Sequence, residues 1–334
     1  MIPLFDLRLE EPDIEAVLDV LRSGELAMGA RVAEFEAAFA AHLGARHAIA
    51  LSSCTAALHL AYLAAGVGPG DEVIVPAMTF AATAAAVVYC GATPVFAEIT
   101  GPHELALDPA DVERRITERT KAVCTVHFAG YPAPPLRELC DAHGLALIED
   151  SAHAPLTGVS GLAAAYSFFS NKVLACGEGG LLATDDDAVA ERVRELRGQY
   201  GYKLDEPRAA LLLARLPRIH EDVARRRELT RAYRARLEGV TVPYDDAAVE
   251  RSSCYVMPVL VEPERRDALR EHLRERGVQT SILYPAIHEF TAYRERFGTP
   301  SLPRTEHVAR AEITLPLFPH MTEAQLDQVV EGLR

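Results

Sequence analysis

The sequence predicts an α/β protein with a large, doubly wound and mostly parallel sheet domain and a smaller C-terminal α+β domain. Short apolar runs of strand length alternate with helical segments over most of the first 200 residues, and this alternation is typical of parallel βαβ units. The chain has 334 residues, 49% of them hydrophobic, so it can bury a large core and form about two domains. We expect the large domain at 1–237 and the small domain at 238–334.

The individual elements follow from apolar periodicity and from the turn residues between the periodic segments. In the large domain we expect strands at 47–51, 72–75, 93–99, 122–126, 145–150, 163–169 and from residue 181. We expect helices at 11–21, 32–43, 108–120, 134–143, 188–197 and 211–237, one that follows directly on the turn at 52–58 and runs to about 65, an alanine-rich helix that ends at 89, and a break at Pro217. In the small domain, strands at 254–261 and 278–281 flank a helix at 263–276.

Charge and composition exclude several classes of function. The formal net charge of −14 argues against nucleic acid as a partner, because phosphate backbones are bound by basic surfaces. No apolar run approaches the ~20 residues of a membrane span, and residues 1–6 lack a basic leader, so we expect no membrane association and a cytoplasmic location. The six cysteines have no metal-type spacing, and we expect neither a disulfide nor a metal site.

An acid and an amine follow two neighbouring predicted strands. Asp150 ends the strand at 145–150, and Ser167 and Lys172 lie at or just past the end of the next one. Taken alone, such an acid is usually a turn residue and such a lysine a solvated charge. Because open α/β sheets carry their chemistry at the carboxyl ends of the strands, we expect the two groups to meet there. With nearby hydroxyl and glycine groups able to hold a phosphate, they form the set that pyridoxal phosphate requires.

A strand-to-helix turn at 52–58 (SSCTAAL) contributes to this set. Small residues at the start of a helix leave free backbone N–H groups that suit a phosphate, although serine and threonine also cap helices that bind no ligand. Taken alone, this turn is more typical of an ordinary capped helix than of a phosphate site.

Three motifs at short spacing make the resemblance specific: EDSAHA at 149–154, SFFSNK at 167–172 and GEGG at 177–180. They resemble the DegT/DnrJ/EryC1/StrS aminotransferases, and the likeness extends from Ile2 nearly to the C-terminus. The resemblance implies the fold-type I architecture, pyridoxal 5′-phosphate as the cofactor and a homodimer. It further implies transfer of an amino group from glutamate or glutamine to a keto-sugar, most often nucleotide-linked, or to a keto-cyclitol, in amino-sugar or antibiotic biosynthesis.

The resemblance also assigns roles to individual residues. Lys172 forms the Schiff base with the cofactor, and Asp150 pairs with the pyridine nitrogen. The remaining expected cofactor contacts are Cys54, Thr55 and Ser167 at the phosphate, Phe80 over the ring and His153 near the ring hydroxyl. Further from the cofactor, the loop at 23–29 (SGELAMG), Tyr284 and His288 are expected near the site entrance. His127 is either a wall of the site or a packed strand-end histidine.

One segment departs from the family. Gly201 stands where the family has an asparagine that reaches the cofactor phosphate of the partner subunit, and Lys203 or Arg208 is the candidate replacement. This departure keeps a cofactor-binding regulatory relative open as an alternative. A dehydratase relative carries histidine in place of Lys172, and a nicotinamide enzyme would need a GxGxxG loop that is missing after the first strand.

Overall fold

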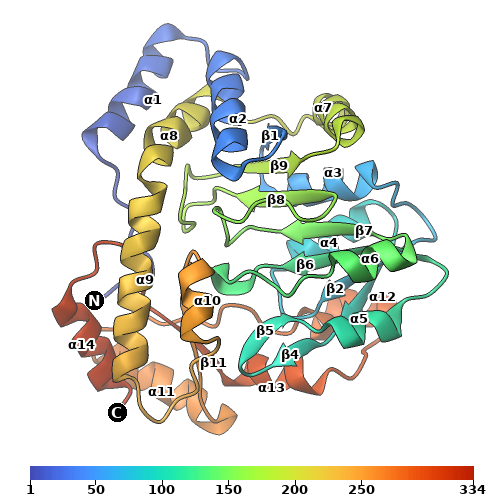
Figure 1. Ribbon diagram of the computed structural model, residues 1–334. Coiled ribbons are helices and arrows are strands. Elements are labelled where there is room, and N and C mark those ends of the chain that lie inside the picture. The colour runs from blue at the N-terminus through green and yellow to red at the C-terminus, as the bar shows by residue number, and fades with distance from the viewer.

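The computed structural model describes residues 1–334 and contains a seven-stranded central sheet with helices on both faces (Figure 1). The strand order is β1-β9-β8-β7-β6-β2-β3. β9 pairs antiparallel with β1 and β8, and the other pairs are parallel, as predicted for a mostly parallel sheet. The strands are β1 (His47–Leu51), β2 (Glu72–Pro76), β3 (Thr93–Ala97), β6 (Thr120–Val126), β7 (Ala146–Asp150), β8 (Ala163–Ser167) and β9 (Gly180–Thr184).

Successive side chains of each strand point to opposite faces of the sheet, so both faces carry apolar side chains. Helices cover both faces. Ile49 of β1 belongs to a buried cluster with α3, α4 and α7, whereas the adjacent Ala50 belongs to another cluster that includes Phe39 of α2. The covering helices are α2 (Ala30–Leu43), α3 (Cys54–Ala64), α4 (Ala82–Tyr89), α5 (Pro109–Arg115), α6 (Arg137–His143) and α7 (Asp187–Tyr200). This arrangement is the doubly wound fold.

A long helical segment links the sheet to the C-terminal region. The predicted break at Pro217 is a short 3-10 turn, η2 (Leu216–Arg218), between α8 (Glu206–Arg215) and α9 (Ile219–Arg236). α8 also packs against the N-terminal α1 (Glu11–Ser23). The boundary at 237–238 stays a prediction.

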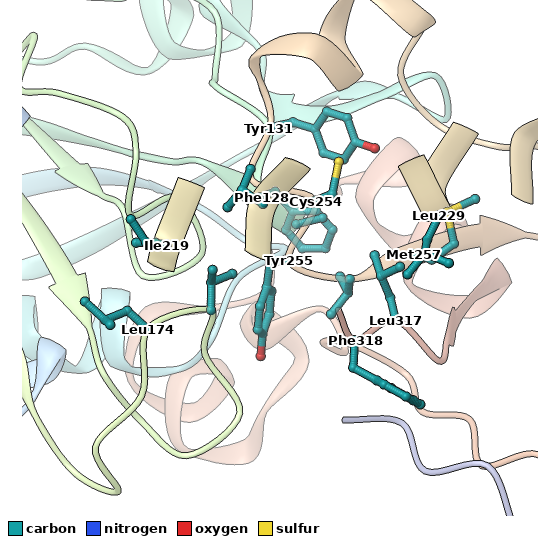
Figure 2. Packing of buried hydrophobic residues seen from close by; sticks show 14 of the residues in the cluster. Phe128, Tyr131, Leu174, Ile219, Leu229, Cys254, Tyr255, Met257, Leu317 and Phe318 are labelled. Carbon is teal, nitrogen blue, oxygen red and sulfur yellow. The ribbon is translucent and has the colours of Figure 1, made fainter. Parts of the chain in front are cut away.

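The C-terminal region contains a second, two-stranded antiparallel sheet of β10 (Met257–Leu260) and β11 (Glu312–Leu315). The helices around it are α10 (Asp246–Arg251), α11 (Pro263–Glu275), η3 (Ile287–Glu289), α12 (Thr291–Phe297), α13 (Pro303–Ala311) and α14 (Glu323–Gly332). One hydrophobic core joins this region to the large sheet. Figure 2 shows part of that core around Tyr255, with Phe128 after β6, Ile219 and Leu229 of α9, and Leu317 and Phe318 after β11.

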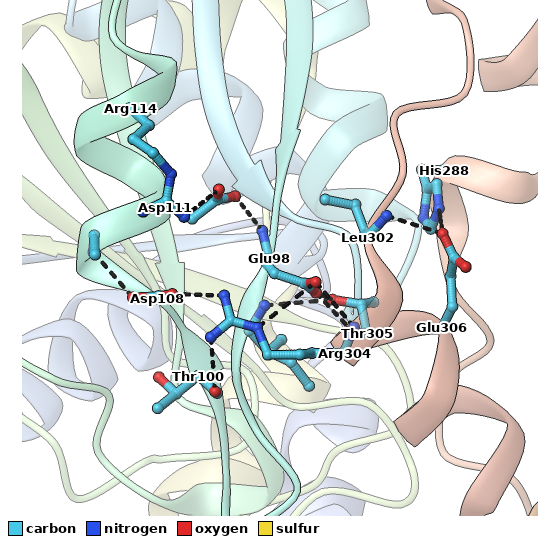
Figure 3. Close-up of polar contacts among 12 residues, drawn as sticks. Glu98, Thr100, Asp108, Asp111, Arg114, His288, Leu302, Arg304, Thr305 and Glu306 are labelled. Carbon is cyan, nitrogen blue, oxygen red and sulfur yellow. Dashed lines mark hydrogen bonds and ion pairs between the residues drawn. The ribbon is translucent and has the colours of Figure 1, made fainter.

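Polar contacts fix α13 against the outer edge of the large sheet (Figure 3). The buried Glu98 accepts hydrogen bonds from the backbone N–H groups of Arg304 and Thr305 at 2.9 and 2.7 Å. The Arg304 guanidinium pairs with Asp108 at 2.6 Å. The C-terminal region is thereby held against the large sheet, whose strands carry the predicted site.

Several predicted elements of the large domain are shorter than expected. The strand predicted at 163–169 ends at Ser167, and the helix predicted at 134–143 begins at Arg137. The strand predicted at 93–99 ends at Ala97, because Glu98 N–H donates to the Asp111 carboxylate, and the hairpin of β4 (Ile99–Gly101) and β5 (Glu104–Leu107) follows. The helix predicted at 108–120 ends at Arg115, because Ile116 has an extended backbone.

Two strands predicted in the small domain also differ. The strand at 254–261 begins only at Met257, because Cys254 has a φ of +46°, which is incompatible with an extended chain. The strand predicted at 278–281 is wrong: Val278 bridges Ile2 and Ser281 bridges Thr314, as isolated bridges to two different segments.

None of the helices combines the length and apolar character needed to cross a membrane. The six cysteines are not paired with one another.

Candidate active site

A cavity of about 410 Å³ lies at the carboxyl ends of β7 and β8. Six of the predicted site residues line it: Cys54, Thr55, Phe80, Asp150, Ser167 and Lys172. The sheet brings them together because β7 and β8 are parallel neighbours, with Asp150 opposite Ala165, two residues before the end of β8. The volume is within the range of small-molecule sites.

Asp150 ends β7 as a buried carboxylate. Its Oδ2 accepts a hydrogen bond from Thr83 Oγ1 at 2.8 Å, and its Oδ1 accepts one from Ala152 N–H at 3.1 Å. Burial raises the pKa of Asp150, and these two hydrogen bonds and the charge of Lys172 oppose that shift. A cationic ligand atom facing Asp150 would favour its charged form further.

Lys172 lies in the turn after β8, where its backbone N–H donates to Phe169 O at 2.8 Å. Its Nζ is 4.4 Å from the centre of the Tyr255 ring. Burial lowers the pKa of Lys172 to about 8, against the opposing influence of Asp150. At pH 7.5 about a quarter of such amines are neutral, compared with about one in a thousand at the ordinary lysine pKa. The amine is therefore able to act as a nucleophile and as a base.

The N-terminus of α3 forms one end of the cavity. Ser53 caps the helix by accepting a hydrogen bond from Ala56 N–H at 3.1 Å. The backbone N–H groups of Cys54 and Thr55 are the first of the helix and have no acceptor within it. These N–H groups and the Thr55 hydroxyl suit an anion such as a phosphate.

Gly180 allows the strand β9 to approach this helix end closely. A Cβ atom on Gly180 would lie 2.2 Å from the Ser53 carbonyl carbon and 2.4 Å from Cys54 N. In β9, Gly180 pairs with Ser167 on one side and with Leu51 on the other, so it also sets the distance from β8 to α3. Steric crowding therefore explains why the last position of the GEGG motif is a glycine.

Much of the rest of the lining comes from segments far from Asp150 and Lys172 in the sequence. The Phe80 ring is 57% exposed, and its centre is 5.9 Å from that of Tyr284. Tyr284 had a sequence signal in YPAIH, whereas Tyr255 had none, and neither had Thr83, which holds Asp150 without lining the cavity. The remaining C-terminal and N-terminal contributors to the lining are Leu4, Phe5, Ser281, Leu283 and Thr314.

The three histidines of interest lie outside the cavity lining. His153 was predicted to touch the cofactor, but its ring is buried between Tyr255 and Tyr284, with centre distances of 4.3 and 5.8 Å. His127 is a packed strand-end histidine: its Nδ1 accepts a hydrogen bond from Ala133 N–H at 3.0 Å. His288 is fully buried, with Nε2 3.5 Å from Glu306 Oε1, so the expectation that it lies at the entrance is wrong (Figure 3).

The divergent segment after α7 lies outside the cavity within one chain. Gly201 is the left-handed C-cap of α7, with a φ of +70°. Lys203 is exposed, and Arg208 pairs with Asp205 at 3.5 Å. The loop at 23–29 is tied to the same segment, since Gly29 N–H donates to the buried Glu206 carboxylate at 2.9 Å.

The cavity fits the cofactor that the sequence predicts. It contains a carboxylate, an amine of lowered pKa, an exposed aromatic ring and a helix N-terminus, all in one lining. Pyridoxal phosphate requires these groups for its ring nitrogen, its aldehyde, its ring face and its phosphate. Because β9 approaches α3 closely at Gly180, the N-terminus of α3 and Ser167 line the same cavity.

Comparisons with known proteins agree with this site. The model of the DegT/DnrJ/EryC1/StrS aminotransferase family matches residues 8–334. The spore coat polysaccharide biosynthesis protein SpsC of Bacillus subtilis is 35% identical, over 96% of this chain and 93% of SpsC.

Two solved structures are similar over the whole chain. DesV of S. venezuelae, in complex with a ketimine intermediate, is 38% identical with a TM-score of 0.92, covering 100% of this chain and 97% of DesV. The aminotransferase TlmJ of Streptoalloteichus hindustanus is 33% identical with a TM-score of 0.94, covering 100% of this chain and 98% of TlmJ. These matches confirm the predicted fold, enzyme class and cofactor. The chain therefore belongs to the DegT/DnrJ/EryC1/StrS family and is a pyridoxal phosphate-dependent aminotransferase.

Proposed function

We propose that this aminotransferase moves an amino group from glutamate or glutamine to a nucleotide-linked keto-hexose. The observation that carries the catalytic part of the proposal is the convergence of Lys172 and Asp150 in one cavity with the N-terminus of α3. The sugar part is supported by the relative SpsC, which is named for polysaccharide biosynthesis.

Pyridoxal phosphate, when bound, supplies an aldehyde that bonds to amines and a ring that takes up an electron pair. Lys172 Nζ is the amine that holds it. With an amino-acid donor bound, the Lys172 amine would take the proton from the donor's α-carbon and later return a proton to the acceptor, as general base and then general acid. A pKa of about 8 allows the amine to accept and to return a proton near neutral pH.

Asp150 keeps the pyridine nitrogen protonated, because an adjacent negative charge favours the cationic form. Thr83 orients that carboxylate through its 2.8 Å hydrogen bond. Cys54 and Thr55 at the start of α3, together with Ser167, hold the phosphate. Phe80, which is largely exposed, would lie against the ring face.

A second cavity, of about 460 Å³, supports an acceptor that carries a diphosphate. It shares Phe5, Asn171 and Lys172 with the first cavity. Four arginines of the segment 203–231 line it: Arg215, Arg218, Arg225 and Arg226.

Two of these arginines have no carboxylate partner. Arg218 is paired with Asp13 at 2.7 Å, and Arg225 with Glu228 at 2.9 Å. Arg215 and Arg226 form no ion pair, and their hydrogen bonds go only to backbone carbonyl oxygens. A charge-assisted contact contributes about 1.5–3 kcal/mol, so two such contacts would account for much of a nucleotide's affinity.

The acceptor is tested with a panel of nucleotide-linked keto-hexoses and a keto-inositol, each with glutamate and with glutamine. We expect amination of the nucleotide-linked sugars and competitive inhibition by the bare nucleoside diphosphate that weakens at high salt. Arg215→Gln should raise the inhibition constant by about tenfold or more. Arg225→Gln, in the same cavity but already paired, is the matched control. Amination of the keto-inositol without nucleotide inhibition would assign the enzyme to cyclitols.

A further inference from the structure

A buried carboxylate lies directly behind one wall of the active-site cavity. Four residues after position 280 line the cavity, and we refer to them as the C-terminal wall: Ser281, Leu283, Tyr284 and Thr314. Glu312, the first residue of β11, is fully buried and is not part of the lining. It acts on the cavity only through the residues that it holds.

The segment that carries Ser281 and Leu283 runs antiparallel to β11. Ser281 N–H donates to Thr314 O at 3.2 Å, and Thr314 N–H donates to Ser281 O at 2.8 Å. In a regular antiparallel pair, the N–H of Leu283 would be the next donor to β11, and its acceptor would be the backbone carbonyl of Glu312. It donates instead to the Glu312 carboxylate, at 2.8 Å from Oε2. A side chain thus replaces the backbone as the acceptor that holds Leu283.

The second carboxylate oxygen of Glu312 holds the other segment of the wall. Glu312 Oε1 accepts a hydrogen bond from the Thr314 hydroxyl at 2.6 Å. The charged groups that face the carboxylate are Arg266 and Arg270 of α11, and neither forms an ion pair with it. β10, the other neighbour of β11, has no titratable residue. The direct contacts of this carboxylate are therefore the two groups that it holds.

The strength of the two contacts depends on the protonation of Glu312. An ionised carboxylate accepts both hydrogen bonds, whereas a protonated one carries a hydrogen on one oxygen and forms only the bonds of a neutral group. Hydrogen bonds to charged groups are roughly twice as strong as neutral ones. Burial raises the pKa of Glu312 to about 7, against the effect of the bonds from Thr314 and Leu283. Both forms are therefore populated near neutral pH.

We propose that Glu312 is a positioning residue that clamps the C-terminal wall: its ionised form holds Leu283 and Thr314 where the substrates contact them, and its protonated form holds them less firmly. The groups assigned to the cofactor, among them Asp150 and Lys172, belong to the large sheet and its turns and helices, so the C-terminal wall is left to contact the substrates. Saturation by substrate should therefore depend on pH through Glu312, whereas the maximum rate should not.

Amide hydrogen exchange of the holoenzyme, without substrates, measures the hold on Leu283. Protection of the segment 281–284, followed by mass spectrometry and corrected for the intrinsic effect of pH, should rise about tenfold between pH 6 and pH 8 in the wild type. Glu312→Gln offers only a neutral acceptor, so it should have the wild-type protection of pH 6 at both pH values. Thr314→Val removes a hydrogen bond to the charged form, so the midpoint of the rise should move upward by about 1–2 pH units.

Glu98→Gln is the matched control for the exchange test. Glu98 is also a buried carboxylate, and it accepts hydrogen bonds from the backbone N–H groups of Arg304 and Thr305, but it lies outside the cavity lining. The rise in protection of the segment 281–284 should stay in place in this variant. Near-ultraviolet circular dichroism checks that each variant is folded.

The kinetic test rests on the proposed donors and uses the conversion of the bound cofactor by glutamate and by glutamine, read from the loss of visible absorbance. At pH 8, Glu312→Gln should raise the donor concentration at half-saturation about tenfold and change the maximum rate by less than about twofold. At pH 6, the variant and the wild type should agree within about twofold, because both then offer a neutral acceptor.

Protection that does not change with pH in the wild type, or a midpoint that Thr314→Val leaves in place, would overturn the clamp. Loss of the rise in Glu98→Gln would assign the effect to general loosening of the C-terminal region and would overturn the clamp as well. If exchange behaves as expected but Glu312→Gln leaves half-saturation unchanged at pH 8, the role of Glu312 in substrate binding is overturned. No conversion of the wild type by either donor would overturn the proposed donors, and the exchange results would still decide the clamp.

Discussion

The hydrogen bond from Thr83 to Asp150 offers a test of the electrostatic design of the site. Thr83 Oγ1 lies 2.8 Å from Asp150 Oδ2, and both side chains are buried. Thr83→Val keeps the shape and removes only the hydroxyl. A hydrogen bond to a charged group contributes about 1.5–3 kcal/mol, so its loss should raise the pKa of Asp150 by about 1–2 units. Asp150 would then hold the pyridinium charge less well, and kcat/KM should fall about 10-fold to 100-fold.

Thr79 provides the matched control. Its Oγ1 lies 2.8 Å from Thr83 Oγ1, and since the Thr83 hydrogen goes to Asp150, Thr79 must be the donor of this second bond. Thr79→Val therefore leaves the bond to Asp150 in place and should change kcat/KM by less than about threefold. Steady-state kinetics and cofactor retention on dialysis are the assays. The reasoning is refuted if folded Thr83→Val has the kinetics and cofactor retention of the control.

Three further predictions concern other parts of the account. In Gly180→Ala the new Cβ would lie 2.2 Å from the Ser53 carbonyl carbon, so the variant should lose cofactor on dialysis and have a lower melting temperature. Normal cofactor retention would show that β9 can move to accept the methyl group, and would contradict this prediction. Burial raises the pKa of Glu312 from 4.5 to about 7, so the native state binds the extra proton and stability falls as pH rises from about 4.5 to about 7. Glu312→Gln should flatten that slope in calorimetric melting between pH 5 and 8, and an unchanged slope would contradict the assignment. We propose that each site of a homodimer receives a phosphate contact from the exposed Lys203 of the partner rather than from Arg208, which is paired with Asp205. Lys203→Ala should then weaken cofactor retention more than Arg208→Ala, and sedimentation should give a dimer for both. Retention equal to that of the wild type in both variants would leave the phosphate held within one chain.

The parts of the site that could be predicted are those placed by local rules. Asp150 and Lys172 follow consecutive parallel strands, and the carboxyl ends of such strands share one edge, so apolar runs alone bring them together. The N-terminus of α3 was predictable for the same reason, because small residues follow a strand directly. The central sheet and its covering helices follow from periodicity within each segment.

The remaining parts depend on contacts between distant segments. Tyr255 lines the cavity and Thr83 holds Asp150, yet both belong to segments far from Lys172 in the chain, and neither lies in a distinctive motif. His153 has the position that the motif predicts, but a tyrosine 131 residues later stands between it and the cavity. The strand predicted at 278–281 failed because its ends pair with Ile2 and Thr314, a choice made by tertiary packing rather than by local sequence.

The most direct test of the central claim is to identify the residue that becomes bonded to the cofactor. Purified enzyme is reduced with borohydride, digested and analysed by mass spectrometry, with Lys172→Ala as the control. We predict a phosphopyridoxyl group on the peptide that contains Lys172, loss of the visible absorbance on reduction, and no label in Lys172→Ala. A label on Lys203 or Lys121, or none on the wild-type protein saturated with cofactor, would contradict the account.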